Sequence, residues 1–355
     1  MKLRHILALL ALTAVLPACA DSSAASAAAS GTREAGARRS VISETLDSAR
    51  LADAYTRAAE LPRLRSLLVE WRDTIVGERY WRGAARDRPA NIKSASKSVI
   101  SALVGIAIDQ KRIRGLDATI AELLPAEART LDSAKRAITV EDLVSMRSGL
   151  QSTSFGDYGA FVTSRNWVRY VLSRPMVADP GGPMIYSTGS THLLSAILTR
   201  ATKTSTLRYA QQQLARPLGI PLRPWTTDPQ GIYFGGNEMR MTPGEMLAFG
   251  RLYLQRGRTR SGRQVVPEAW IDSSWVPRGV SPWNGHSYGY GWWIREAHGH
   301  PVYFAWGYGG QFIFIVPTLK LLVVTTSDAN TSRDGGHLEA IHSLVDDHLI
   351  PAVSR

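Results

Sequence analysis

The chain has 355 residues, of which 44% are hydrophobic and 20% charged, a composition typical of a soluble globular enzyme with a large core. This length favours one large domain or two interleaved lobes. The 42 basic and 30 acidic residues give a formal net charge of +12, which favours anionic neighbours such as lipid headgroups, cell-wall polymers or nucleic acid. The sequence holds no zinc finger, base-reading basic helix or aromatic-interleaved basic strand, so we expect a solvated basic surface and no nucleic-acid partner.

The N-terminus has the pattern of an export signal. Lys2 and Arg4 form a short positive region, and Ile6–Leu16 is an apolar run too short to span a membrane comfortably. Cys19 follows directly, in a context that resembles a bacterial lipoprotein signal cleaved before a lipidated cysteine. We therefore predict a signal peptide over residues 1–19 and an exported protein of the periplasm or cell envelope, anchored to the membrane through lipid on Cys19. A simple secretory signal cut beside this cysteine is the alternative.

Residues 20–45 are expected to form a flexible tether. They are rich in Ala, Ser, Gly and Arg and carry no apolar period up to about residue 40. Cys19 is the sole cysteine of the sequence, so it cannot form an internal disulfide, and lipidation accounts for its presence in an exported protein. The rest of the chain, residues 46–352, is predicted to form the enzyme domain.

The first half of this domain is expected to contain one hairpin and several helices. Two β-rich runs, 64–72 and 74–81, predict an antiparallel hairpin. The segment 94–111 is apolar nearly all round, which predicts a helix in the middle of the protein. Apolar runs with capping residues predict further helices over 139–149, 189–202 and 205–214.

The C-terminal third is rich in aromatic and β-branched residues, which predicts strands separated by short turns and therefore an antiparallel sheet. We predict an α/β protein of the α+β type, in which both chain ends form one antiparallel sheet flanked by helices, with a mostly helical lobe inserted between them. Strands are expected at 288–294, 302–306, 312–316 and 321–326, and a closing helix at 338–349. The sheet lobe is expected to comprise about residues 46–93 and 221–352, and the helical lobe about residues 94–220.

The segment Ser94–Lys97 (Ser-Ala-Ser-Lys) places a hydroxyl and an amine three residues apart, on one face of the expected helix. A serine in the first turn of a helix can offer its own N–H to an oxyanion, aided by the helix dipole. A lysine held below it in apolar surroundings loses its proton more easily, because burial disfavours the charged form. The pair therefore predicts a nucleophile, Ser94, that Lys97 activates. The position of the motif at the start of the most apolar helix carries this prediction, since Ser-x-x-Lys by itself is a weak signal.

Tyr186 lies near the end of a turn-rich segment that leads into a helix. A phenol close to a lysine ammonium is favoured as the phenolate and can pass a proton to a leaving group. An ordinary half-buried tyrosine is the alternative interpretation.

A glycine-rich turn, Ala305–Gln311 (Ala-Trp-Gly-Tyr-Gly-Gly-Gln), separates two expected strands. Glycines let the backbone approach a ligand closely and present an N–H to an oxyanion. A tight turn relaxed by glycine is the alternative, and no helix follows, so a nucleotide-binding loop is excluded.

Together these segments resemble the serine β-lactamase-like family, in the branch of class C β-lactamases, D,D-carboxypeptidases, D-aminopeptidases, certain esterases and 6-aminohexanoate-dimer hydrolases. The resemblance runs from about residue 64 to residue 350 and implies the penicillin-recognising fold. It rests on segment 94–98 as the nucleophile motif, 138–150 as the helix that follows, 186–188 as the Tyr-x-Asn motif and 217–220 as the end of the helical lobe.

Two departures from the family pattern bear on the substrate. Thr188 replaces the asparagine of Tyr-x-Asn, which keeps a hydroxyl but loses the amide. Ala305–Gly307 replaces Lys-Thr-Gly or His-Thr-Gly, so the cation that holds a substrate carboxylate is absent, and Trp306 offers an apolar wall. The resemblance further implies that the N–H of Tyr308 pairs with that of Ser94 as the oxyanion hole.

The expected reaction is acyl transfer from a small ester, amide or peptide-like substrate: Ser94 attacks the carbonyl, Lys97 and Tyr186 move the proton, and water releases the acyl-enzyme. An esterase or amidase is favoured; a β-lactamase or D,D-peptidase, and a non-catalytic lipoprotein that binds cell-wall fragments or drugs, are the alternatives. No metal or cofactor is expected, because His298 and His300 have no identifiable third ligand and read as a hairpin loop. The absence of Gly-x-Ser-x-Gly leaves nucleophile-elbow hydrolases unsupported.

Overall fold

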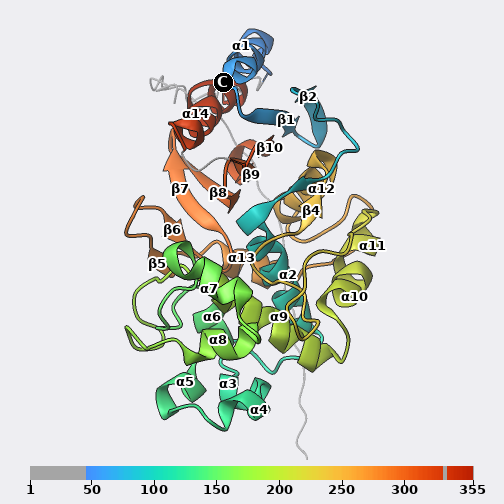
Figure 1. Cartoon of the computed structure of the whole chain (residues 1–355). Coiled ribbons are helices and arrows are strands. Elements are labelled where there is room, and N and C mark those ends of the chain that lie inside the picture. The colour runs from blue at the N-terminus through green and yellow to red at the C-terminus, as the bar shows by residue number, and fades with distance from the viewer. Residues whose placement is uncertain (1–44, 331–333, 355) are drawn as a thin grey trace, which may run out of the picture. The chain divides into compact units, whose positions relative to one another are not determined.

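The computed structural model describes residues 45–330 and 334–354 and contains an eight-stranded antiparallel sheet, whose longer strands lie in the upper half of Figure 1. Cys19 and the other residues of the predicted signal and tether up to residue 44 lie outside this range. No helix within it is long and apolar enough to cross a membrane. The strands are β1 (Leu64–Trp71), β2 (Thr74–Tyr80), β5 (Gly279–Val280), β6 (Ser287–Tyr288), β7 (Trp293–Ala297), β8 (His300–Gly307), β9 (Gln311–Val316) and β10 (Leu321–Ser327), with β3 (Ala90–Asn91) and β4 (Arg240–Met241) in a separate pair.

The sheet order is β2-β1-β10-β9-β8-β7-β6-β5, so β1, the first strand of the chain, pairs directly with β10, the last one, and β2 lies at the edge. The predicted antiparallel sheet built from both chain ends is therefore confirmed, and helices flank it (Figure 1). The helices are α1 (Ser48–Glu60), α2 (Ser96–Asp109), α3 (Ile120–Leu123), α4 (Pro125–Ala128), α5 (Ser133–Ala137), α6 (Val140–Val144), α7 (Tyr158–Thr163), α8 (Trp167–Ser173), α9 (Thr188–Thr202), α10 (Thr206–Ala210), α11 (Arg216–Leu218), α12 (Pro243–Leu254), α13 (Glu268–Ser274), α14 (His337–Ser343) and α15 (Ile350–Val353).

Side-chain alternation in the central strands divides the core into two layers. In β10, Leu321 and Val323 belong to the cluster that packs with α1 and the C-terminal helices, whereas Leu322 and Val324 belong to the cluster around α2 and α12. Successive strand residues point to opposite faces, and here both faces are covered, so the first four residues of β10 are all apolar. The sheet is thereby fixed between two helical layers.

The predicted hairpin is confirmed, with β1 and β2 antiparallel. Its two turn residues, Arg72 and Asp73, have φ values of 50° and 63°, the left-handed region that a two-residue type I′ hairpin turn requires.

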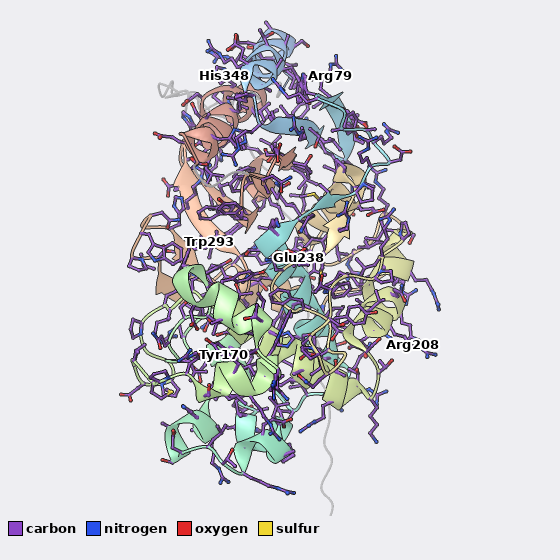
Figure 2. All side chains as sticks on the ribbon, viewed as in Figure 1. Arg79, Tyr170, Arg208, Glu238, Trp293 and His348 are labelled. Atoms are coloured by element: carbon purple, nitrogen blue, oxygen red, sulfur yellow. The ribbon has the colours of Figure 1, made fainter. Side chains whose placement is uncertain are left out.

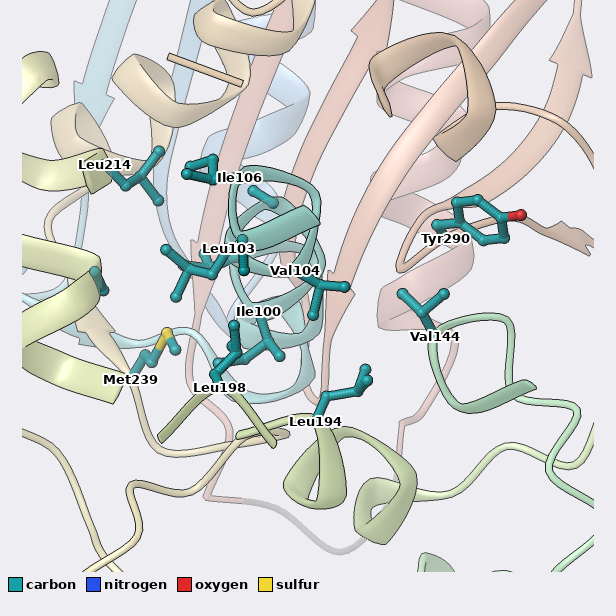
Figure 3. Packing of buried hydrophobic residues seen from close by; sticks show 14 of the residues in the cluster. Ile100, Leu103, Val104, Ile106, Val144, Leu194, Leu198, Leu214, Met239 and Tyr290 are labelled. Atoms are coloured by element: carbon teal, nitrogen blue, oxygen red, sulfur yellow. The ribbon is translucent and has the colours of Figure 1, made fainter. Parts of the chain in front are cut away.

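The apolar helix expected at 94–111 is α2, and it lies in the middle of the protein as predicted. All its residues from Ser96 to Ala107 are buried. Figure 3 shows its side chains Ile100, Leu103 and Val104 surrounded by apolar residues of other elements. The 3-10 turn η1 (Lys93–Ala95) precedes it, so Ser94 lies one turn before the α-helix proper.

Three predicted elements differ in extent. The helix expected over 139–149 has the predicted Thr139 cap, in a capping box with Asp142, but it ends at Val144, because Met146 takes a φ of 62° that no α-helix accommodates. The single strand expected at 288–294 is two short strands, β6 and β7, since Gly291 (φ 78°) interrupts the extended backbone. The helix at 205–214 is α10, prolonged by a π-helical turn into α11.

Candidate active site

Ser94 and Lys97 lie together, as the sequence predicts. The Lys97 ammonium nitrogen, Nζ, is 3.0 Å from Ser94 Oγ, because the 3-10 turn carries directly into α2 and keeps residues three apart on one face. Lys97 is 2% exposed. This burial lowers the pKa of Lys97 from 10.5 to about 7, since removal from water disfavours the charged form. A substantial fraction of the amine is therefore unprotonated at neutral pH and can accept a proton from Ser94.

The other partners of Lys97 are neutral oxygens. Nζ donates to the backbone carbonyl of Gly236 at 2.7 Å and lies 3.4 Å from Thr188 Oγ1. Within the described residues Lys97 has no carboxylate partner, so nothing offsets the desolvation that lowers its pKa. The three contacts fix the position of the amine without holding it in the charged form.

Tyr186 lies against the same pair. Lys97 Nζ is 5.0 Å from the centre of its ring. Burial raises the pKa of the Tyr186 phenol well above its usual value, and the nearby Ser94 hydroxyl opposes this only in part. The expectation of a phenolate is therefore not supported. The neutral phenol is favoured because the group is buried and because Lys97, with its lowered pKa, carries only part of a positive charge at neutral pH. A neutral phenol can still donate its proton to a leaving group.

Thr188 lies beside Lys97, in the same site as Ser94. It is the first residue of α9, and its hydroxyl lies 3.4 Å from Lys97 Nζ and 2.9 Å from Ser154 Oγ. Ser154 Oγ also accepts the Thr188 backbone N–H, at 2.9 Å. The missing asparagine amide is thus replaced by a pair of hydroxyls, and sequence analysis missed Ser154, the second of them.

The Gly236 carbonyl is another partner that sequence analysis missed. A Cβ at Gly235 would lie 2.0 Å from the Thr191 carbonyl oxygen, and one at Gly236 would lie 2.5 Å from Thr191 Oγ1. Only glycine allows the backbone to approach α9 this closely, and the approach brings the carbonyl to Lys97. The consecutive glycines 235 and 236 were the feature of the sequence that could have indicated this close approach.

The glycine-rich turn after β8 lies next to the turn that carries Ser94. The end of β8 packs against η1, and a Cβ at Gly307 would stand 2.1 Å from the Ile92 carbonyl oxygen, two residues before Ser94. Tyr308 follows on the surface, 53% exposed. This arrangement brings the backbone of Gly307, the residue before Tyr308, to the start of the Ser94 turn.

An aromatic cluster extends from Tyr186 in two directions. Trp293, labelled in Figure 2, stacks on Tyr186 with ring centres 5.6 Å apart. The Trp306 ring centre is 5.3 Å from that of Trp293, so Trp306 contacts Trp293, which in turn contacts Tyr186. Toward the surface, Trp283 lies 5.6 Å from Tyr186 and 5.2 Å from Phe155. Phe155 and Trp283 are 68% and 50% exposed. Two exposed rings therefore stand at the edge of the site, from loops that sequence analysis did not place.

The histidines considered as metal ligands lie elsewhere. His298 has a φ of 51° in the turn between β7 and β8, where Ala297 pairs with His300, so the predicted hairpin is confirmed. His300 Nδ1 lies 2.9 Å from Thr318 Oγ1. Among the described residues, no group of three or more His, Cys, Asp or Glu side chains has the arrangement of a metal site.

Structures of the same fold have been solved for several hydrolases and for a synthase. A protein of Bacillus anthracis described as a 6-aminohexanoate-dimer hydrolase shares 21% identity, with a TM-score of 0.71, over 84% of this chain and 81% of that one. EstCE1, a hydrolase with promiscuous acyltransferase activity, shares 18% identity and a TM-score of 0.70, over 84% and 98%. A mutant of simvastatin synthase from Aspergillus terreus shares 17% identity and a TM-score of 0.65, over 85% and 98%.

Comparison with curated proteins finds no match. The beta-lactamase family model, in contrast, matches residues 66–345, which include the Ser94–Lys97 pair, Tyr186 and the glycine-rich turn. Proteins with this fold in the family are serine hydrolases. The match covers most of the domain that the structure describes, and the resemblance drawn from the motifs points the same way: the chain belongs to the beta-lactamase family.

Proposed function

We propose that the protein is a serine hydrolase that cleaves small ester or amide substrates through an acyl-enzyme on Ser94. The observation that carries this proposal is the buried Lys97 amine, 3.0 Å from Ser94 Oγ, with a pKa lowered to about 7. A base with a pKa close to the working pH, within hydrogen-bond distance of a hydroxyl, is the arrangement that general-base catalysis requires.

The proton path follows the hydrogen bonds. Ser94 Oγ attacks the carbonyl carbon as its proton passes to Lys97, and the carbonyl oxygen becomes an oxyanion facing the N–H groups of Ser94 and Tyr308. The neutral Tyr186 phenol donates its proton to the leaving alkoxide or amine and regains one from Lys97. Water then attacks the acyl-enzyme by the reverse route and frees the acid.

Labelling with a fluorophosphonate probe separates this function from its alternatives. Covalent attachment to the peptide that contains Ser94, located by mass spectrometry, supports a catalytic serine, whereas a purely binding protein of the envelope stays unlabelled. A β-lactamase or D,D-peptidase would also be labelled, so that alternative is decided by substrate preference.

Uncharged esters should be better substrates than carboxylated ones. Ala305–Gly307 provides no cation where the family usually has one, and loss of a charged hydrogen bond to a carboxylate costs about 1.5–3 kcal/mol, or roughly ten- to a hundredfold in binding. We expect a higher kcat/KM for short-chain p-nitrophenyl esters than for a cephalosporin or a D-Ala-D-Ala peptide, measured side by side. A clear preference for either carboxylated substrate would contradict this proposal.

The exposed rings of Phe155 and Trp283 should favour aryl groups. A flat ring can pack against both side chains, and aromatic pairs contribute about 0.5–1.5 kcal/mol beyond burial. We expect Trp283→Ala to lower kcat/KM for phenyl acetate about three- to tenfold, chiefly through KM, with little effect on ethyl acetate. Val280→Ala is the matched control, since Val280 lies on the neighbouring strand β5 and is 59% exposed. Equal losses for both esters would show that Trp283 does not select aryl groups.

A further inference from the structure

A cavity separate from the candidate active site lies beside the turn that carries Ser94. Its volume is about 500 Å³, and Ser94, Lys97 and Tyr186 do not line it. Its walls come from the end of β10, the β3-β4 pair and the loop that joins β2 to β3. Five cationic side chains line it, against a single carboxylate, Asp328: these are Arg65, Arg82, Arg88, Lys93 and Arg240.

Two of the five cations are neutralised by neighbours. Arg65 pairs with Asp328 at 2.7 Å, and Lys93 Nζ lies 3.5 Å from Glu238, which is labelled in Figure 2 just before β4. Glu238 also accepts a hydrogen bond from Asn91 Nδ2 at 2.8 Å. These contacts pair Arg65 and Lys93 with carboxylates. Among the described residues, no carboxylate pairs with the other three cations of the cavity.

The remaining three guanidinium groups hydrogen-bond only to backbone carbonyl oxygens within the described residues. Arg82 donates to the carbonyls of Leu64 and Ala59, Arg88 to that of Gly83, and Arg240 to that of Pro89. A carbonyl oxygen orients a guanidinium but does not cancel its charge. The cavity therefore carries about three uncompensated positive charges. In a concave site the positive potentials of such charges add up and attract an anion.

We propose that this cavity binds a phosphate group of a small soluble ligand. A guanidinium presents paired N–H donors that match phosphate oxygens, and several guanidinium groups around one concave site suit a dianion better than a single carboxylate. The volume admits a phosphate together with a small organic part. The site does not depend on the hydrolytic function proposed for Ser94, although Lys93, the residue before the nucleophile, lines it.

Calorimetric titration of the full chain with inorganic phosphate at fixed ionic strength tests the proposal. We expect measurable binding that the double variant Arg88→Gln, Arg240→Gln weakens about tenfold or more, since two charged hydrogen-bonding groups are lost. Arg86→Gln is the matched control, because Arg86 lies in the same loop but is exposed and pairs with Glu78 outside the cavity. That control should leave the Kd within about threefold. Equal affinities of the double variant and the wild type, or no binding by the wild type, would overturn the proposal.

Competition on the wild type provides a test that does not depend on any variant's folding. Sulfate, a tetrahedral dianion like phosphate, should displace it, whereas acetate at equal ionic strength should not. Equal displacement by acetate would contradict a phosphate site. Glycerol phosphate and phosphatidylglycerol vesicles separate the sources of the phosphate group: binding of the soluble compound supports the proposal, and vesicle binding that depends on Arg88 and Arg240 without binding of the soluble compound contradicts it.

Discussion

Replacement of Ser94 by alanine should abolish ester hydrolysis and fluorophosphonate labelling while the fold is retained. The hydroxyl is the acceptor of the acyl group in the proposed reaction, so no acyl-enzyme forms without it. Ser94 lies in a 3-10 turn and is only partly buried, so the loss of one oxygen atom should cost little stability. Hydrolysis rates, labelling and thermal denaturation of the same preparation provide the measurement.

Ser96→Ala is the matched control for this experiment. Ser96 belongs to the same motif, but its side chain is buried and donates to the Lys93 carbonyl at 2.5 Å, away from the proposed reaction. This variant should still be labelled and should still hydrolyse esters. Hydrolysis by Ser94→Ala at the wild-type rate would rule out Ser94 as the nucleophile.

Lys97→Met should remove activity and raise stability together. Without the base, kcat/KM should fall about a hundredfold or more, because a general base contributes about 10²- to 10⁴-fold. In the wild type, kcat/KM should rise as the pH increases through about 7, where Lys97 loses its proton. Measurement of kcat/KM against pH for both proteins checks this. A wild-type profile that is flat through pH 7 would exclude Lys97 as the titrating base.

Burial of Lys97 lowers the free energy of unfolding of the wild type at neutral and acidic pH. The Lys97 pKa is about 7 in the folded state and 10.5 as the reference for the unfolded chain, so between these values the unfolded state binds more protons. The free energy of unfolding of the wild type therefore rises with pH from about 7 to about 10.5, and burial of the amine costs about 5 kcal/mol below pH 7. Methionine avoids this cost but leaves the Gly236 carbonyl unpaired, which costs about 1–3 kcal/mol. The net expected gain is about 2–4 kcal/mol below pH 7.

Chemical denaturation of both proteins at pH 6 and at pH 10 measures this gain. It should be present at the lower pH and should disappear at the higher one. At pH 10 the folded-state amine is neutral, and its burial costs only about 1 kcal/mol, which does not exceed the cost of the unpaired Gly236 carbonyl in the variant. Lys111→Met, which changes an exposed lysine after α2, is the matched control and should show no such pH dependence. Equal stability of Lys97→Met and wild type at both pH values would mean that Lys97 is not held in a destabilising site.

The sequence by itself determined the Ser94–Lys97 pair, the fold class and most of the longer strands. These depend on spacing along the chain: Ser94 and Lys97 meet because residues three apart share a helix face, and the apolar strands had to lie inside a sheet covered on both sides. Tyr186 was predicted from its segment and the resemblance, and the structure brings it to the same pair.

Only the tertiary structure decided which distant groups surround that pair. The Ser154 hydroxyl with the neighbouring Phe155 ring, the Gly236 carbonyl and the Trp283 ring come from three segments far apart in the chain. No local period places such segments against one another. The protonation states were decided in the same way. Burial raises the pKa of Tyr186 and lowers that of Lys97, because desolvation depends on everything packed around a group and not on its sequence neighbours.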